Sequence, residues 1–409
     1  MQFNSSANLY GSHRSDLYSD HHIVVIGAGI QGAGIAQAFS AAGYEVTVLE
    51  KKSIGGATSS NSSKLIHGGL RYLETAQFNL VRTCLKERAL LLKLAPELVF
   101  LRRFHIPIYR DSLRHSWQIR AGLSLYQLLG GGQYNALKRS QWSSLDGLRH
   151  DDLTHVYDYF DAQTDDLQLT RAVMVSAQDL GTECLTEAQV TAIDIGSHGC
   201  EVYFHHAGRE QQIRAAAVIN CAGPWVNSIL QRVNPKQPRL DLELVQGSHL
   251  LIDNSDIKQH FYLQSPIDKR AFFVLPWQGK LLVGTTETPY YGRPEDVQCL
   301  PEEEDYLLRG LYHYFPNKKF SYPIQQRLCG LRVLPQSYEK NAFWRHRETL
   351  YQFNQPSNSS IKPRFVTVAG GKLTTYRLSA QTVLKQLKAS LVARKAIAQT
   401  NSILLTPAK

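Results

Sequence analysis

The chain has 409 residues, enough for two or three domains whose cores need no disulfide bonds. Hydrophobic residues make up 43% and charged residues 20% of it, which excludes a globally disordered chain, and no apolar run approaches the ~18 residues typical of a membrane-spanning helix. The net charge of +10 favours anionic partners, a phosphorylated metabolite or an acidic lipid surface, and without a recognition module in the sequence we expect no nucleic-acid binding.

The chain is predicted to open with a polar leader followed by a βαβ unit. Residues 1–20 contain no apolar stretch of a secretory signal, so we expect a disordered leader on a cytoplasmic protein. The apolar run 21–26 predicts a buried strand, the alanine-rich stretch after the glycine turn predicts a helix to about residue 42, and 44–49 predicts a second strand.

Three glycines between the first strand and the helix, Gly27, Gly29 and Gly32, form the pattern G-x-G-x-x-G, and Glu50 ends the second strand. The first glycine allows a tight turn, the second lets a pyrophosphate approach the backbone, and the third lets helix and strand pack closely. A carboxylate at Glu50 can accept a hydrogen bond from a ribose hydroxyl and repels a 2′-phosphate. The unit predicts a dinucleotide site, and its spacing fits FAD and NAD equally.

A loop rich in hydroxyl groups follows this unit. Residues 57–74, ATSSNSSKLIHGGLRYLE, contain five Ser and Thr side chains and the pair Gly68-Gly69. Such a loop can hold a pyrophosphate and the edge of a flavin. From the residues alone, a flexible serine-rich linker is an equally good interpretation.

The remaining pattern alternates helices and strands. Apolar spacings of three and four predict a helix over 76–95, which Pro96 ends. Residues 101–126 are basic and amphipathic, which fits either a segment on an anionic membrane surface or a cap-domain helix with a solvated basic face. Further expected elements are helices over 168–180 and 301–314, strands over 183–193, 201–206, 211–219 and 364–368, a strand-rich region over 240–286, and a final helix from Leu373. The six cysteines form no C-x-x-C unit, and we expect no metal site.

Several of these segments together resemble one known family. The 57–74 loop closely resembles the FAD-linked, aerobic-type glycerol-3-phosphate dehydrogenases of the D-amino-acid-oxidase-like superfamily. The similarity continues in order through the blocks YFDAQTDD, VINCAGPWV, QGSHLLI, FFVLPW, LLVGTTE, GLR and AGGKLTTYR.

The resemblance implies an α/β fold with two domains. One is a Rossmann-like FAD-binding domain of the D-amino-acid-oxidase/glutathione-reductase type, expected from residues 21–100, 150–235 and 326–409. The other is a strand-rich substrate cap, expected from 101–149 and 236–325.

The resemblance also assigns roles to individual residues. Arg71, Tyr72, Arg332 and Lys372 are expected to bind the substrate, and His67, followed by His249, is the expected base for the hydroxyl proton. The AGGKLTT turn is not a Walker A loop, because Val366 and Leu373 stand where that loop needs Gly and Ser or Thr. Its helix is expected to direct its N-terminus at the flavin pyrimidine. The expected cofactor-binding residues are Gly27, Gly29, Gly32, Glu50, Thr58, Ser59, Ser63, His67, Gly69, Val190, Gly223, Gly371, Lys372 and Leu373.

The implied reaction is oxidation of sn-glycerol 3-phosphate to dihydroxyacetone phosphate with hydride transfer to FAD, and quinone or oxygen as acceptor. A peripheral position on the inner face of the cytoplasmic membrane is part of this expectation. Departures from the family pattern, among them Gln246 for Lys, Glu287 for Asp and a missing C-terminal helical domain, leave two alternatives. One is an FAD oxidoreductase for another 2-hydroxy acid or an amino acid, and the other is a flavin-binding protein without turnover.

Overall fold

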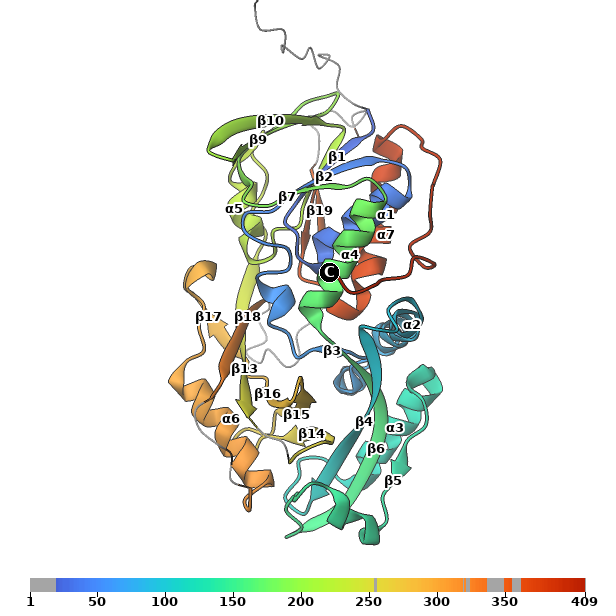
Figure 1. The fold of residues 1–409 in the computed structure, drawn as a ribbon, viewed down its shortest axis with the longest axis vertical. Coiled ribbons are helices and arrows are strands. Elements are labelled where there is room, and N and C mark those ends of the chain that lie inside the picture. Colours follow the sequence, from blue (N-terminus) through green and yellow to red (C-terminus); the bar gives the residue numbers. More distant parts are fainter. Residues whose placement is uncertain are drawn as a thin grey trace, which may run out of the picture.

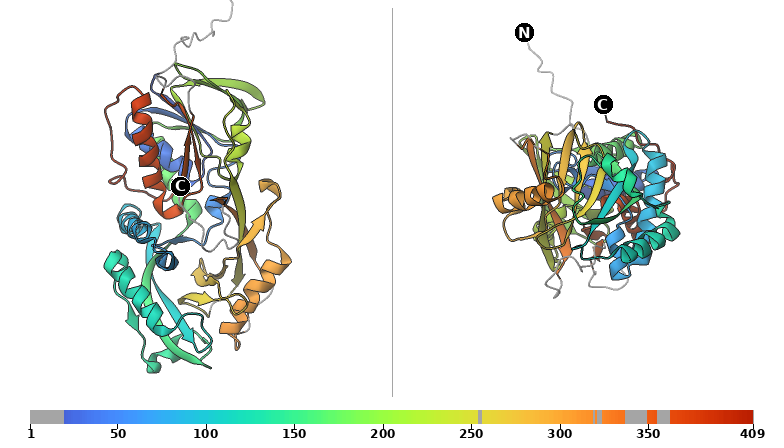
Figure 2. Two further views of the ribbon diagram at one scale, coloured as in Figure 1. Left: turned by 180° about the vertical axis from the view of Figure 1, so that it is seen from behind. Right: turned by 90° about the horizontal axis from the view of Figure 1, so that it is seen from below.

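The computed structural model describes residues 20–253, 256–318, 320, 324–336, 349–354 and 362–408. Apart from Asp20, the predicted leader therefore lies outside the described residues. The upper half of Figure 1 is built on a six-stranded sheet and the lower half on a ten-stranded sheet. Figure 2 shows helices α2 (Phe78–Leu94) and α3 (Ser116–Tyr126) on one side of the lower half and α6 (Pro301–Tyr314) on the other.

The six-stranded sheet carries the predicted βαβ unit. Its strand order is β19-β20-β11-β1-β2-β7, parallel except for β19. The strands are β1 (His22–Ile26), β2 (Glu45–Leu49), β7 (Glu183–Leu185), β11 (Ala217–Asn220), β19 (Leu350–Phe353) and β20 (Phe365–Ala369). Its apolar runs are buried on both faces, as a parallel sheet covered on both sides requires. The expected Rossmann-like α/β fold is confirmed by this arrangement.

Helices and a second sheet cover the two faces. Helix α1 (Ile30–Ala41) is buried almost throughout because α4 (Asp166–Asp179) and α7 (Tyr376–Leu387) flank it. A four-stranded sheet, β10-β9-β8-β12, packs on the other face. Its strands are β8 (Gln189–Ile195), β9 (Cys200–His206), β10 (Arg209–Ala215) and β12 (Val233–Asn234).

The ten-stranded sheet forms the strand-rich half. Its main path is β17-β13-β16-β15-β14-β4-β6-β3, with β18 paired to β13 and β5 paired to β6. The strands are β3 (Leu65–Ile66), β4 (Val99–Tyr109), β5 (Asn135–Ala136), β6 (Leu153–Thr164), β13 (Leu242–Asp253), β14 (His260–Gln264), β15 (Ala271–Trp277), β16 (Lys280–Gly284), β17 (Thr288–Tyr290) and β18 (Gln326–Pro335). The short helix α5 (Val226–Leu230) comes after strand β11 of the six-stranded sheet.

Three sequence-based expectations differ from the structure. The basic segment 101–126 is not one amphipathic element, because its first part belongs to β4, where Phe104, Ile106 and Ile108 are buried in the sheet. The strand predicted over 183–193 is split into β7 and β8, since Glu187 adopts a φ of 55° that turns the chain from one sheet to the other. The strand predicted over 211–219 is likewise divided between β10 and β11.

The pairing of strands also bears on the expected domain boundaries. Residues 150–164 and 326–335 were assigned to the cofactor domain, whereas β6 and β18 pair within the ten-stranded sheet. Figure 1 draws both strands in the lower half, with the other strands of that sheet. Among the described residues, no helix is long and apolar enough to cross a membrane, and no cluster of three metal-ligating side chains occurs.

Candidate functional site

A cavity of about 740 Å³ lies between the two halves, at the carboxyl ends of the parallel strands. Its size is within the range of small-molecule and cofactor sites, and its place is where open α/β sheets bind ligands. Every predicted site residue lines it except Gly32. The structure thus brings together residues from positions 27 to 373, although their roles remain predictions.

The first glycine turn forms one wall of the cavity. Residues with a side chain would not fit at Gly27 or Gly32. Gly27 has a φ of 97°, and a Cβ on it would lie 2.7 Å from the carbonyl oxygen of Cys221. A Cβ on Gly32 would lie 1.9 Å from the carbonyl oxygen of Gly27, which explains why Gly32 is under the turn and away from the cavity. Gly29 precedes helix α1, whose first backbone N–H, at Ile30, donates to Ser59 Oγ over 2.9 Å. The turn, the start of the helix and the serine loop therefore lie together on one side of the cavity, where the sequence predicts a pyrophosphate.

Glu50 is held at the end of β2 by backbone donors. Its carboxylate accepts hydrogen bonds from Ala28 N at 2.7 Å and from Lys52 N at 2.8 Å. Val190 lines the same end of the cavity, and its carbonyl oxygen accepts from Arg232 Nη1. Gly223, with a φ of 53°, lies near the turn as well.

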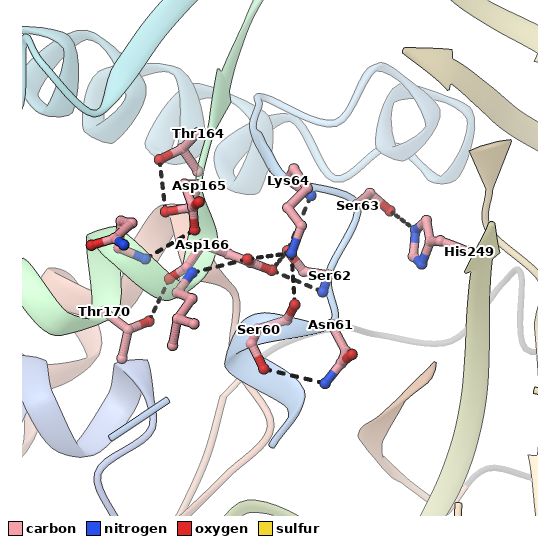
Figure 3. A network of polar contacts seen from close by, with 12 residues as sticks. Ser60, Asn61, Ser62, Ser63, Lys64, Thr164, Asp165, Asp166, Thr170 and His249 are labelled. Atoms are coloured by element: carbon pink, nitrogen blue, oxygen red, sulfur yellow. Dashed lines mark hydrogen bonds and ion pairs between the residues drawn. The ribbon is translucent and has the colours of Figure 1, made fainter. Parts of the chain in front are cut away.

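The serine-rich loop is fixed by a buried ion pair that the sequence analysis did not identify (Figure 3). Lys64 Nζ lies 2.5 Å from Asp166 Oδ1 and 2.6 Å from the Ser60 carbonyl oxygen. The other Asp166 oxygen accepts from Ser62 N and Ser62 Oγ. Lys64 is 5% exposed and Asp166 is 0% exposed, so the loop is bound to the start of α4 and is not a flexible linker. Burial raises the pKa of Asp166 while the Lys64 charge opposes that rise.

The second glycine turn lines the same cavity and lies next to the start of helix α1. Gly371 has a φ of 91°, and a Cβ there would lie 2.6 Å from Gln31 Nε2. A 3₁₀ turn at Leu373–Thr375 precedes α7, and Thr374 Oγ1 accepts from His67 N. Lys372 Nζ lies 3.7 Å from the centre of the Tyr72 ring, a cation–π contact.

The opposite end of the cavity is lined by arginines. Arg332 donates from Nη1 to Glu287 Oε1 over 2.8 Å and from Nη2 to Thr285 Oγ1 over 3.0 Å. Arg71 Nη2 lies 3.7 Å from the same Glu287 oxygen. Arg270, which the sequence analysis missed, also lines the cavity and donates to the Glu287 carbonyl oxygen. Basic residues in this number suit an anionic substrate.

The two histidines differ in their surroundings. His249 is 2% exposed, its Nε2 lies 2.9 Å from Ser63 Oγ (Figure 3), and its ring covers Gly284, where a Cβ would lie 2.1 Å from the ring. Burial, with the charges of Arg332 and Lys64, lowers its pKa to about 3, so it is uncharged at neutral pH. Its Nδ1 is buried and has no hydrogen-bond partner among the described residues. His67, in the 57–74 loop, also lines the cavity.

The Gly68–Gly69 part of the 57–74 loop is held by a second buried network. Asp161 accepts from Arg88 Nη1 at 2.6 Å and from the Tyr126 hydroxyl at 2.9 Å, and Tyr126 in turn accepts from Gly68 N. These three residues are at most 5% exposed. They fix the Gly68–Gly69 segment, which leads into Arg71.

The residues present fit FAD. Besides the glycine cradle and the Glu50 carboxylate, Gln31 Oε1 is buried against the cavity with no hydrogen-bond partner in the described part of the chain, and a cofactor polar group there would satisfy it. The glycines at 29 and 371 leave room that side chains would fill.

Comparisons with known proteins agree with this geometry. The model of the FAD dependent oxidoreductase family matches residues 22–371. The chain is 34% identical to D-erythritol 1-phosphate dehydrogenase of Brucella abortus, covering 90% of this chain and 73% of that protein. It is 33% identical to aerobic glycerol-3-phosphate dehydrogenase of Escherichia coli, covering 89% and 73%. The glycerol-3-phosphate dehydrogenase of Bacillus halodurans, solved with FAD, superposes with a TM-score of 0.73 at 25% identity, over 95% of this chain and 68% of that one.

Proposed function

Since the chain belongs to the FAD-dependent oxidoreductase family, we propose that it oxidises a polyol phosphate, with sn-glycerol 3-phosphate as the first candidate and dihydroxyacetone phosphate as its product. The observation that carries the proposal is the convergence of Arg71, Arg332 and Lys372 on the cavity that also holds the dinucleotide turn. This arrangement supports a phosphate at one end and a cofactor at the other.

FAD, when bound in this cavity, would supply the hydride acceptor. In the proposal, Arg71 and Arg332 bind the phosphate, because guanidinium groups form charge-assisted hydrogen bonds with its oxygens. Lys372, on the second glycine turn, places a positive charge between the phosphate end and the cofactor end. The ten-stranded half covers the substrate and excludes water.

His67 is the proposed acceptor of the hydroxyl proton. A general base works best when its pKa lies near the working pH. The pKa of about 3 makes His249 a weak base, so we propose that it orients the substrate as an uncharged hydrogen-bonding group.

A four-carbon substrate is the second candidate. The identity to D-erythritol 1-phosphate dehydrogenase, 34%, is as high as the identity to the glycerol-3-phosphate dehydrogenase of Escherichia coli, 33%. A longer polyol phosphate would use the same arginines for its phosphate and the same cofactor end for its reacting carbon. With either substrate, the reduced flavin would pass its electrons to quinone or oxygen.

The experiment that tests the proposal is anaerobic mixing of the purified protein with each compound while the flavin absorbance is followed. We expect bleaching by sn-glycerol 3-phosphate or by D-erythritol 1-phosphate, and none by glycerol. If only a 2-hydroxy acid or an amino acid bleaches the flavin, the proposed substrate class is wrong and that compound class takes its place. A flavin that no compound reduces would favour a flavin-binding protein without turnover.

We also propose that the face carrying α3 contacts the inner surface of an anionic membrane, where a quinone would be met. Trp117 is 67% exposed and Leu128 is 83% exposed, and the exposed Arg110 and Arg120 flank them. Basic and apolar side chains together favour binding to acidic lipid.

This contact predicts that the protein cosediments with acidic vesicles and that Trp117→Ala reduces the bound fraction several-fold. At 1 M salt the screening length falls to ~3 Å, so release is expected. Recovery with neutral vesicles that equals the recovery with acidic ones would contradict it.

A further inference from the structure

One residue, Glu287, contacts three arginines that reach the cavity from three parts of the chain. Its side-chain Oε1 lies 2.8 Å from Arg332 Nη1 and 3.7 Å from Arg71 Nη2. Its main-chain oxygen accepts from Arg270 Nη1 over 2.9 Å. Glu287 follows β16 directly before β17, Arg332 lies on β18, and Arg71 lies on the loop after β3.

The carboxylate stands where the proposed phosphate would bind. The side chains of Glu287, Arg71 and Arg332 are 7%, 16% and 23% exposed, so their interaction is only partly screened by water. All three residues line the cavity. Arg270 forms an ion pair with a different carboxylate, because its Nε lies 2.6 Å from Asp268 Oδ2. Among the residues that the structure describes in this cavity, Glu287 thus places a carboxylate within ion-pair distance of both Arg71 and Arg332.

We propose that Glu287 is a positioning counter-ion that weakens anion binding to Arg71 and Arg332, so that the phosphorylated product is released quickly. The inference rests on the function proposed above. Substrate and product carry the same phosphate, so the arginines bind both, and such uniform binding lowers KM without raising kcat. A carboxylate within ion-pair distance of both guanidinium groups lowers the positive potential at the subsite and limits that binding.

The charge of Glu287 is tested by titrating inorganic phosphate into the oxidised, FAD-loaded protein in a calorimeter at fixed ionic strength. We expect Glu287→Gln, which keeps the shape and an acceptor for Arg332, to bind phosphate about tenfold or more tightly than wild type, because close charge pairs couple by at least ~1.5 kcal/mol and each decade is ~1.36 kcal/mol. Glu287→Asp keeps the charge and should stay within about threefold of wild type. The KM for the phosphorylated substrate should fall in the Gln variant along with the phosphate Kd.

A matched control is Glu304→Gln, which removes a carboxylate that pairs with an arginine, Arg327, away from the cavity. Its phosphate affinity should equal that of wild type. Equal or weaker phosphate binding by Glu287→Gln, at unchanged FAD content and melting temperature, would overturn the inference and leave the proposed function intact. If neither wild type nor Glu287→Gln binds phosphate, the phosphate subsite is absent and both the inference and the proposed function are wrong.

Discussion

Replacing Arg332 with alanine is expected to lower kcat/KM for sn-glycerol 3-phosphate by about 30- to 5,000-fold while the FAD content stays unchanged. Loss of the guanidinium would leave the phosphate charge partly unpaired in a cavity with limited access to water, which costs ~2–5 kcal/mol, and each decade of rate is ~1.36 kcal/mol. The residue contacts Glu287 and Thr285 on the substrate side, whereas the cofactor cradle is formed by other segments. The measurement is steady-state kinetics at matched flavin occupancy.

Arg327→Ala provides the control, because Arg327 lies on the same strand, β18, but forms an exposed pair with Glu304. An exposed ion pair is worth less than ~1 kcal/mol, so its effect should be about fivefold or less. An effect of Arg332→Ala as small as that of Arg327→Ala would exclude Arg332 from the substrate site and would favour a substrate without phosphate.

Replacing Lys64 with methionine is expected to lower the free energy of unfolding by ~3–5 kcal/mol, because it leaves the fully buried Asp166 carboxylate without its cation. The serine loop should loosen at the same time, since Asp166 also binds Ser62. Denaturant unfolding of the FAD-loaded protein, followed by tryptophan fluorescence, measures the loss, and flavin fluorescence reports whether FAD escapes first.

The control for this change is Lys269→Met, which removes the lysine of the exposed pair with Asp111 and should cost less than ~1 kcal/mol. In the double variant Lys64→Met, Asp166→Leu, much of the lost stability should return, because no charge is left buried. Equal losses for Lys64→Met and Lys269→Met would show that the buried pair does not hold the loop.

The parts of the fold that were predictable are those set by neighbouring residues. The turn at Gly27, Gly29 and Gly32 follows from local backbone and packing constraints, and the helix over 301–314 follows from its proline and acidic first turn. The prediction of one amphipathic segment over 101–126 was wrong for residues 101–109. Their arginines suggested a solvated surface, whereas their burial depends on pairing with β6, some fifty residues later in the chain.

The parts of the site that were missed depend on pairs that are distant in the sequence. Lys64 and Asp166 are 102 residues apart, and nothing near either residue indicates the other. Glu287 appeared in the sequence only as a departure from a family pattern. Its place between Arg71 and Arg332 arises because β18 is antiparallel to β13, which sets Arg332 opposite Val245 and beside the 285–287 segment. Hydrophobic periodicity in the sequence does not indicate contacts between side chains that lie this far apart in the chain.

The parallel order β20-β11-β1 has a consequence for how the protein is made. Gly27 and Gly371 both line one cavity, yet 344 residues separate them along the chain. At a synthesis rate of ~5–20 residues per second, the second glycine leaves the ribosome roughly 20–70 s after the first. In the later part of that interval, after β11 has been made, β11 has no β20 to pair with, and an unpaired strand edge is a site for association with other chains. FAD can be enclosed only once the last strand has docked, so the nascent chain must be protected before its cofactor is able to stabilise it.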